Sequence, residues 1–82
     1  MSLDPNLQAV GRAVRRAREA AEISQESLAA DADLHRNFVG LIERGERAPG
    51  LITLLKFAAI LGVHPAEFFS DPHFDQFKKP GT

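Results

Sequence analysis

The chain has 82 residues, a formal net charge of −1 and no cysteine, and 44% of its residues are hydrophobic and 26% charged. This length allows one small domain whose core gives modest stability, so association of two copies is a natural supplement. The composition is that of a folded chain, and the absence of cysteine excludes disulfides, a thiol nucleophile and a thiolate metal site.

Neither a membrane segment nor an export signal is expected. No apolar run approaches the roughly 20 residues of a membrane span. The start of the chain carries Asp4 and Pro5 where a signal peptide has a basic region followed by an apolar one. These features are compatible with a reducing cytosol, so we expect a cytoplasmic protein.

The first predicted helix covers Leu7 to Ala21, and Asp4 and Pro5 suit its start. An apolar stripe with helical spacing runs along it, formed by Leu7, Val10, Val14, Ala17 and Ala21. Three arginines point away from this stripe and are expected to be solvated: Arg12, Arg15 and Arg16. Arg18 falls at the edge of the stripe, close enough to reach inward.

Two short helices follow. Ser24 is a good N-cap for a helix over Gln25 to Ala32, and a tight connection follows at residues 33–34. The inward residues of the next helix are Phe38, Val39 and Ile42, and Gly45 closes this segment as a C′ residue.

The last part of the chain contains a longer helix from Leu51 to Leu61, which Gly62 stops, and Pro65 opens a short helix through Phe69. The residues from Ser70 onward show no clear period, and strand alternation is missing throughout. We therefore expect an all-α fold of five short helices, with a domain over residues 1–69 and a tail over residues 70–82.

Several motifs occur in a specific order and spacing. In chain order they are Gly11 to Arg18, Ser24-Gln25-Glu26-Ser27-Leu28-Ala29, Val39-Gly40-Leu41-Ile42-Glu43-Arg44-Gly45 with Pro49, Leu54-Leu55-Lys56-Phe57-Ala58, and Leu61-Gly62-Val63. Together they resemble the Cro and phage-repressor type helix-turn-helix family over about residues 7 to 69. The resemblance implies a five-helix lambda-repressor-like domain, with the helix-turn-helix at helices 2 and 3, that binds double-stranded DNA in the cytoplasm, associated with the nucleoid, and regulates transcription.

Three positions depart from the family pattern. Asp33 stands where glycine is usual, at a left-handed turn position that Asp occupies at some cost. His64 stands where Ser or Asp usually caps the last helix, and Gly40 stands at a position in helix 3 that is often Ser. None of them opposes the fold, and the change at Gly40 affects specificity.

The resemblance places the outer face of helix 3 in the DNA major groove and implies four base-reading residues: Arg36, Asn37, Gly40 and Leu41. Arg pairs well with guanine and Asn with adenine, and a Leu can cover a thymine methyl group. Leu41 could equally be an ordinary exposed leucine. Gly40 costs about 1 kcal/mol in a helix interior relative to Ala. Either a side chain there would collide with base edges, or the helix packs closely on another, and its outward direction favours the first reading.

Contacts to the DNA backbone are expected from four residues: Gln25, His35, Arg44 and Arg47. The resemblance implies that Gln25, at the head of helix 2, clamps a phosphate, although a solvated residue is the alternative. The family also implies a partly buried salt bridge between Arg18 and Glu43, which we assign to architecture.

Helix 4 is apolar nearly all round, and four of the six phenylalanines lie between residues 68 and 77. The core of a monomer covers one face of helix 4, so the second apolar face predicts contact with another protein chain. We expect a homodimer whose interface includes Ile52, Ala59, Ile60, Phe69, Phe74 and Phe77. The sequence leaves open which phenylalanines complete the core.

The stretch from Arg12 to Arg47 holds seven arginines and seven acidic residues. We call this stretch the reading head, and its lack of net charge predicts modest non-specific affinity for DNA. It also leaves room for another class of function, an antitoxin-like or regulator-sequestering module with a protein partner. The three histidines lack metal-ligand spacing, and His73 is expected to be solvated, so we expect no metal, no cofactor and no enzyme activity.

Overall fold

The computed structural model describes residues 3–77, so the last five positions of the predicted tail, 78–82, lie outside the described residues. The elements in chain order are α1 (Pro5–Ala20), α2 (Gln25–Asp31), α3 (Phe38–Glu43), α4 (Leu51–Leu61) and the 3₁₀ helices η1 (Pro65–Phe69) and η2 (Pro72–Phe77). Residues 3–77 contain no β-strand, and the prediction of an all-helical fold is confirmed. The predicted last short helix is present as η1, with 3₁₀ geometry.

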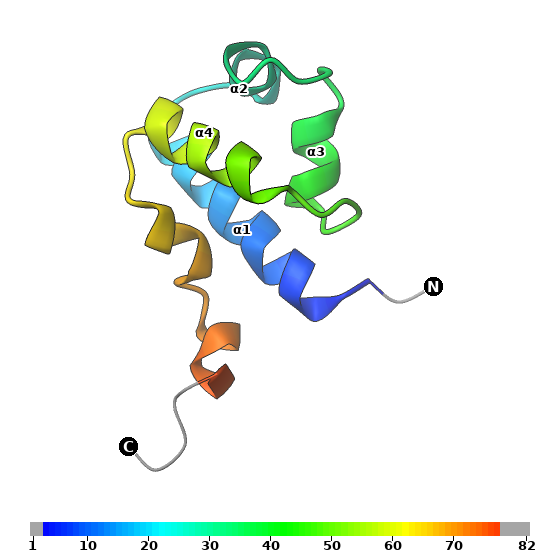
Figure 1. Ribbon diagram of the computed structural model, residues 1–82, viewed down its shortest axis with the longest axis vertical. Helices are drawn as coiled ribbons and strands as arrows, with labels where there is room; N and C mark the ends of the chain where they lie inside the picture. Colours follow the sequence, from blue (N-terminus) through cyan, green and yellow to red (C-terminus); the bar gives the residue numbers. More distant parts are fainter. Residues whose placement is uncertain (1–2, 78–82) are drawn as a thin grey trace.

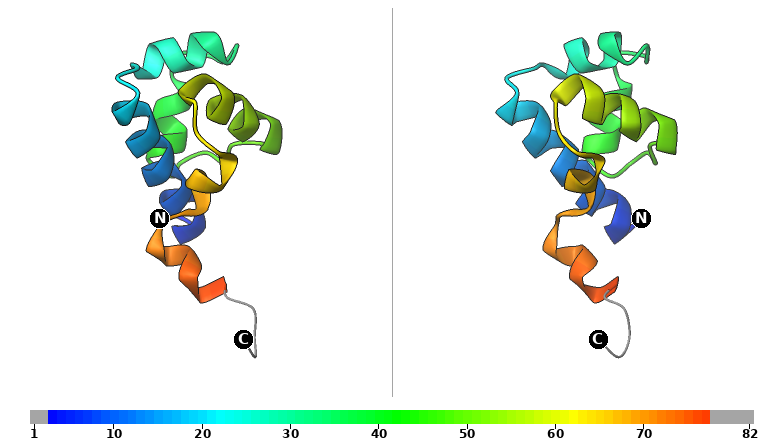
Figure 2. Two further views of the ribbon diagram at one scale, coloured as in Figure 1. Left: turned by 90° about the vertical axis from the view of Figure 1, so that its left-hand side faces the viewer. Right: turned by 60° about the vertical axis from the view of Figure 1, so that its left-hand side comes forward.

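The elements are arranged around α1, which runs along the length of the molecule (Figure 1). In Figure 1, α2 lies at the top of the molecule, α3 lies to the right, and α4 passes in front in the upper half. η1 packs on both α1 and α4. η2 continues to the opposite end, beside the beginning of α1 (Figure 2).

Local side-chain caps explain where the helices begin. Asp4 Oδ1 accepts a hydrogen bond from the Asn6 amide at 2.7 Å, so α1 begins two positions before the predicted Leu7. Ser24 Oγ accepts from the Ser27 amide at 3.0 Å at the start of α2. His64, which departs from the family pattern, caps η1 in the same way, because its Nδ1 accepts from the Ala66 amide at 3.0 Å.

The core is formed where α1, α2, α3, α4 and η1 meet, and its largest fully buried side chains are Phe57, Phe68, Leu28, Ile42, Val14 and Val39. Phe57 and Phe68 are therefore the phenylalanines that complete the core. α1 and α3 cross closely at Gly11, where a Cβ atom would overlap the carbonyl oxygens of Ile42 and Glu43. Only glycine permits this approach of the two backbones.

Two turns use left-handed backbone conformations. Asp33 has φ of 59°, so the expectation of a left-handed turn residue after α2 is confirmed. Glu22, in the turn after α1, has φ of 58°, which no sequence signal indicated. L-residues adopt this region at some energetic cost, and Asp tolerates it better than Glu.

The beginning of the tail is ordered in a way that the sequence pattern did not indicate. Residues 72–77 form η2, which packs on α1. Arg12 Nε donates to Asp71 Oδ2 at 3.0 Å, and the Asp71 side chain is only 9% exposed. The His73 amide donates to Asp71 Oδ1 at 2.9 Å, and the His73 ring lies 2.7 Å from Asn6 Oδ1. His73 is only partly exposed, because tertiary contacts with α1 cover one part of it, so the expectation that it is solvated holds in part.

Candidate nucleic-acid interface

A groove of about 480 Å³ lies between α2 and α3. Seven residues line it: Gln25, Glu26, Arg36, Asn37, Gly40, Leu41 and Arg44. All four residues predicted to read bases are brought together here, along with two of the four predicted to contact the DNA backbone. The groove also contains Glu26, to which the sequence analysis gave no site role.

Two polar residues of the groove, Arg36 and Asn37, lie directly before the first turn of α3. Arg36 and Asn37 are exposed and lie in the turn before Phe38, where α3 begins. The Asn37 side chain forms no capping hydrogen bond, so its amide is available to a ligand. The Asn37 backbone amide donates to His35 Nδ1 at 3.2 Å, which fixes the conformation of this turn.

Gly40 forms the floor of the groove. It is buried, although the sequence pattern placed it on the outward face. A Cβ atom at this position would lie 3.1 Å from Arg44 Nη1 and 3.5 Å from Gln25 Oε1. The burial arises because the side chains of Gln25 and Arg44 fold over the helix at this point. A larger residue here would displace two groove side chains.

A hydrogen-bonded chain of three residues connects α1 with the groove. Arg18 Nε and Nη2 donate to the two carboxylate oxygens of Glu43 at 2.6 and 3.1 Å, and the two side chains are only 12% and 3% exposed. The predicted ion pair is therefore present, and the hydrogen bonds that Arg18 donates to Glu43 raise the pKa of Arg18 above its ordinary value. Glu43 Oε1 also accepts from Gln25 Nε2 at 2.9 Å. This bond holds the Gln25 amide at the edge of the groove and leaves its second N–H free to donate.

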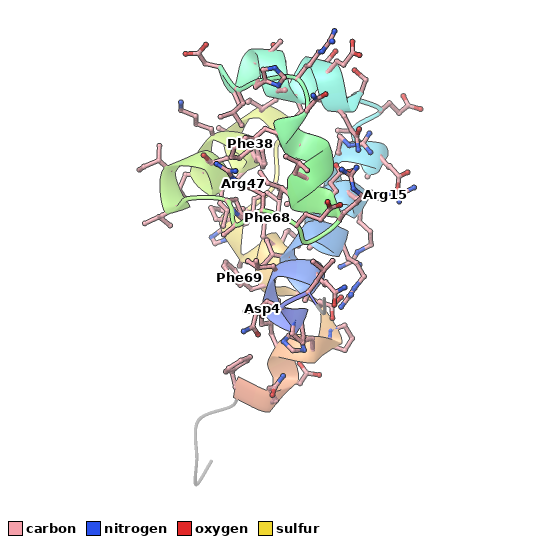
Figure 3. The ribbon with its side chains drawn as sticks, turned by 90° about the vertical axis from the view of Figure 1, so that its right-hand side faces the viewer. Asp4, Arg15, Phe38, Arg47, Phe68 and Phe69 are labelled. Atoms are coloured by element: carbon pink, nitrogen blue, oxygen red, sulfur yellow. The ribbon has the colours of Figure 1, made fainter. Side chains whose placement is uncertain are left out.

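The other predicted backbone-contact residues lie around the groove. Arg44 forms an exposed ion pair with Glu46. The Arg47 guanidinium lies over the Phe38 ring at 5.2 Å from its centroid, and Figure 3 shows the two side chains next to each other. His35 and Arg47 are both exposed but do not line the groove. A cation over an aromatic face is held in place without losing its charge.

The residues predicted for a dimer interface occupy α4, η1 and η2. Ile52, Phe69 and Phe77 are 64%, 52% and 63% exposed, and Ala59 is also exposed. Ile60 and Phe74 are instead partly buried against the core, because they lie at the edges of their helical faces. Two further exposed leucines extend the apolar surface of α4, Leu51 and Leu55.

The part of the chain from residue 3 to residue 77 contains no cluster of three or more His, Cys, Asp or Glu side chains that could hold a metal ion. Among these residues, no helix has both the length and the apolar character needed to cross a membrane.

Known proteins share the sequence pattern of this region. A family model described as helix-turn-helix matches residues 14–68, which end within η1, so η2 lies beyond the match. Control protein C.MunI from a Mycoplasma species is 44% identical over 54 residues, which is 66% of this chain and 73% of that protein. Control protein C.BamHI from Bacillus amyloliquefaciens is 41% identical over 58 residues, which is 70% of this chain and 72% of that protein.

A solved structure shares the fold as well. The restriction-modification controller protein C.AhdI from Aeromonas hydrophila superimposes with a TM-score of 0.76 at 39% identity, covering 80% of this chain and 100% of that one. The family match covers more than half of the chain and contains both helices that form the groove. The chain belongs to the helix-turn-helix family of DNA-binding transcription regulators.

Proposed function

We propose that this chain binds a pseudo-palindromic DNA operator as a homodimer and controls the transcription of restriction-modification genes. The observation that carries the proposal is the groove between α2 and α3, which gathers Arg36, Asn37 and Leu41 beside a fixed Gln25. The gene class is taken from the relatives, which are named as control proteins and, for C.AhdI, as a restriction-modification controller.

The base-reading surface is the beginning of α3 and the turn before it. The exposed Asn37 amide has the donor and acceptor that match adenine, and the Arg36 guanidinium matches guanine. Leu41, one turn further along, offers an apolar contact for a thymine methyl group. The buried Gly40 supports this surface indirectly, because the absence of a Cβ atom leaves room for the side chains of Gln25 and Arg44 in the groove.

Contacts to phosphates surround the base-reading surface. Gln25 has one amide N–H engaged with Glu43 and a second available for a phosphate oxygen. Arg44, Arg47 and His35 are exposed around the groove and supply further donors. Since the head is neutral overall, this electrostatic component is small, and specific affinity depends on base contacts and on the second subunit.

Two copies of the chain associate through a dimer interface formed by α4, η1 and η2. Four of the six residues predicted for this interface are exposed apolar side chains, which is unusual for a chain that stays monomeric. In a two-fold dimer the α3 helices enter successive major grooves about 34 Å apart, so the operator has two related half-sites.

The test selects bound sequences from a random DNA pool at controlled salt, with light scattering after size exclusion on the same sample. Recovery of an inverted repeat by a protein of dimeric mass is the expected result. A folded dimer that enriches no sequence would contradict the operator proposal and favour a protein partner. An enriched single half-site bound by a monomer would contradict the dimer.

A further inference from the structure

One of the seven residues that line the groove is a carboxylate. Glu26 is the second residue of α2, is exposed and faces the same groove as Arg36 and Arg44. Four ion pairs occur among residues 3–77, and none of them includes Glu26. Within the described residues, the groove that must approach a polyanion therefore contains one carboxylate without an ion-pair partner.

The other acidic residues of the reading head do not have this position. Glu19, Glu43 and Glu46 are each paired with an arginine. The remaining acids lie outside the groove: Glu22, Asp31 and Asp33. Glu26 is thus distinguished from them by combining exposure, a place in the groove and the absence of an arginine partner within the described part of the chain.

We propose that Glu26 faces a DNA phosphate and weakens binding to every duplex, independently of its sequence. The first helix of a helix-turn-helix unit crosses the DNA backbone while the second reads bases, so a groove residue on α2 meets a phosphate and not a base edge. Glu26 also follows Gln25, whose free amide N–H we assign to a phosphate. The inference rests on the proposed function of the groove.

The consequence is a limit on the affinity of each subunit. Two like charges a few ångströms apart repel each other, and this repulsion is weakened by salt. The penalty occurs once per subunit and twice in a dimer. Because each subunit alone binds weakly, occupancy of the operator depends on dimer formation.

The test measures the affinity of full-length Glu26→Gln for the selected operator and for an unrelated duplex, at several salt concentrations. We expect both affinities to rise about three- to tenfold at low salt, with an unchanged ratio between them. Asp31→Asn is the matched control, because it removes the same charge from the same exposed helix outside the groove. It should change affinity less than about twofold, because water and salt screen its charge from the DNA. Gln and Glu have similar helix propensities, and thermal unfolding checks that both variants fold.

Three results would overturn the inference. If Glu26→Gln binds the operator as the unaltered protein does, Glu26 does not meet a phosphate. If it binds the operator more weakly and accepts more bases at one position, the carboxylate reads a cytosine amino group instead. If the unaltered protein binds neither duplex, the proposed function fails and the inference fails with it.

Discussion

Two arginines of α1 hold the opposite ends of the molecule through carboxylates, and the two pairs differ in burial. Arg18 joins α1 to Glu43 at the reading head, with side chains 12% and 3% exposed. Arg12 joins α1 to Asp71, the residue before η2. In this second pair the arginine side chain is 53% exposed and the carboxylate side chain is 9% exposed. The same chemistry therefore operates in two environments. The buried pair ties the head firmly to α1, whereas water reaches one side of the pair that holds the C-terminal element.

The difference in burial has a functional counterpart. Glu43 also holds the Gln25 amide, so the buried pair fixes a groove side chain as well as two helices. The Asp71 pair instead positions the segment that carries Phe74 and Phe77, which belong to the proposed dimer face. A rigid head and a separately held interface are expected of a protein that reads DNA with one surface and associates through another.

The largest effect is expected from Glu43→Ala. This change leaves the mostly buried Arg18 without its partner and frees Gln25, so the free energy of unfolding should fall by about 3 to 5 kcal/mol. Chemical denaturation measures the loss. The matched control is Glu46→Ala, which removes an exposed partner of Arg44 and should cost no more than about 1 kcal/mol. If the two variants lose the same free energy of unfolding, burial does not make the Arg18–Glu43 pair stronger than the exposed Arg44–Glu46 pair.

The second prediction concerns the surface that the buried pair supports. Asn37→Ala should lower affinity for the selected operator by about 1 to 3 kcal/mol, because it removes a side chain suited to bidentate contact with adenine. The Asn37 side chain is exposed and makes no capping bond, so thermal stability should stay the same. Binding titrations and thermal unfolding are measured together. Unchanged affinity for the operator would rule out Asn37 as a base-reading residue.

The third prediction concerns the effect of pH on the Arg12–Asp71 pair. The hydrogen bond from Arg12 lowers the pKa of Asp71 to about 2, which is below the ordinary value for an aspartate. A carboxyl group with a lowered pKa in the folded state adds stability above about pH 4, and this contribution is lost as the pH falls toward 2. Between pH 7 and pH 2, the midpoint temperature of thermal unfolding should therefore fall less steeply for Asp71→Asn than for the unaltered protein.

Hydrogen exchange checks where this effect arises. Asp71→Asn removes the charge that pairs with Arg12 and holds this segment on α1, so the neighbouring His73 amide, which donates to Asp71 Oδ1, should exchange faster. The exchange rate of the Ser27 amide, which donates to Ser24 at the other end of the molecule, should not change. If the unfolding temperatures of the two proteins depend on pH in the same way, or if both amides exchange faster to the same extent, Asp71 does not act locally.

The smallest effect is expected from an exposed pair on the same helix. Arg15 and Glu19 lie 3.4 Å apart at positions four residues apart, with side chains 64% and 55% exposed. Glu19→Gln should lower stability by about 0.3 to 0.5 kcal/mol at low salt and by less at high salt. Denaturation at two salt concentrations measures it. A loss as large as that of Glu43→Ala would contradict the view that burial sets the energetic scale.

The comparison also shows how far the sequence alone could lead. Ser24, Gly45 and Gly62 act within a few residues of themselves, and the helix bounds that depend on them were predicted well, with α4 correct at both ends. The resemblance to a known family supplied the Arg18–Glu43 pair, which periodicity placed only at the edge of an apolar face. The sequence indicated neither the Arg12–Asp71 pair nor the contact of His73 with Asn6, since the residues of these pairs lie 59 and 67 positions apart in the chain.

Periodicity and caps determined the all-helical class and the order of the helices, because these features depend on short-range geometry along the chain. The family resemblance supplied the groove residues other than Glu26. The tertiary structure decided that Gly40 is buried beneath two long side chains, that Phe68 enters the core while Phe69 stays exposed, and that a buried Asp71 fastens η2 to α1. Each of these depends on which distant side chains meet, and that is settled only when the packed helices bring them within contact distance.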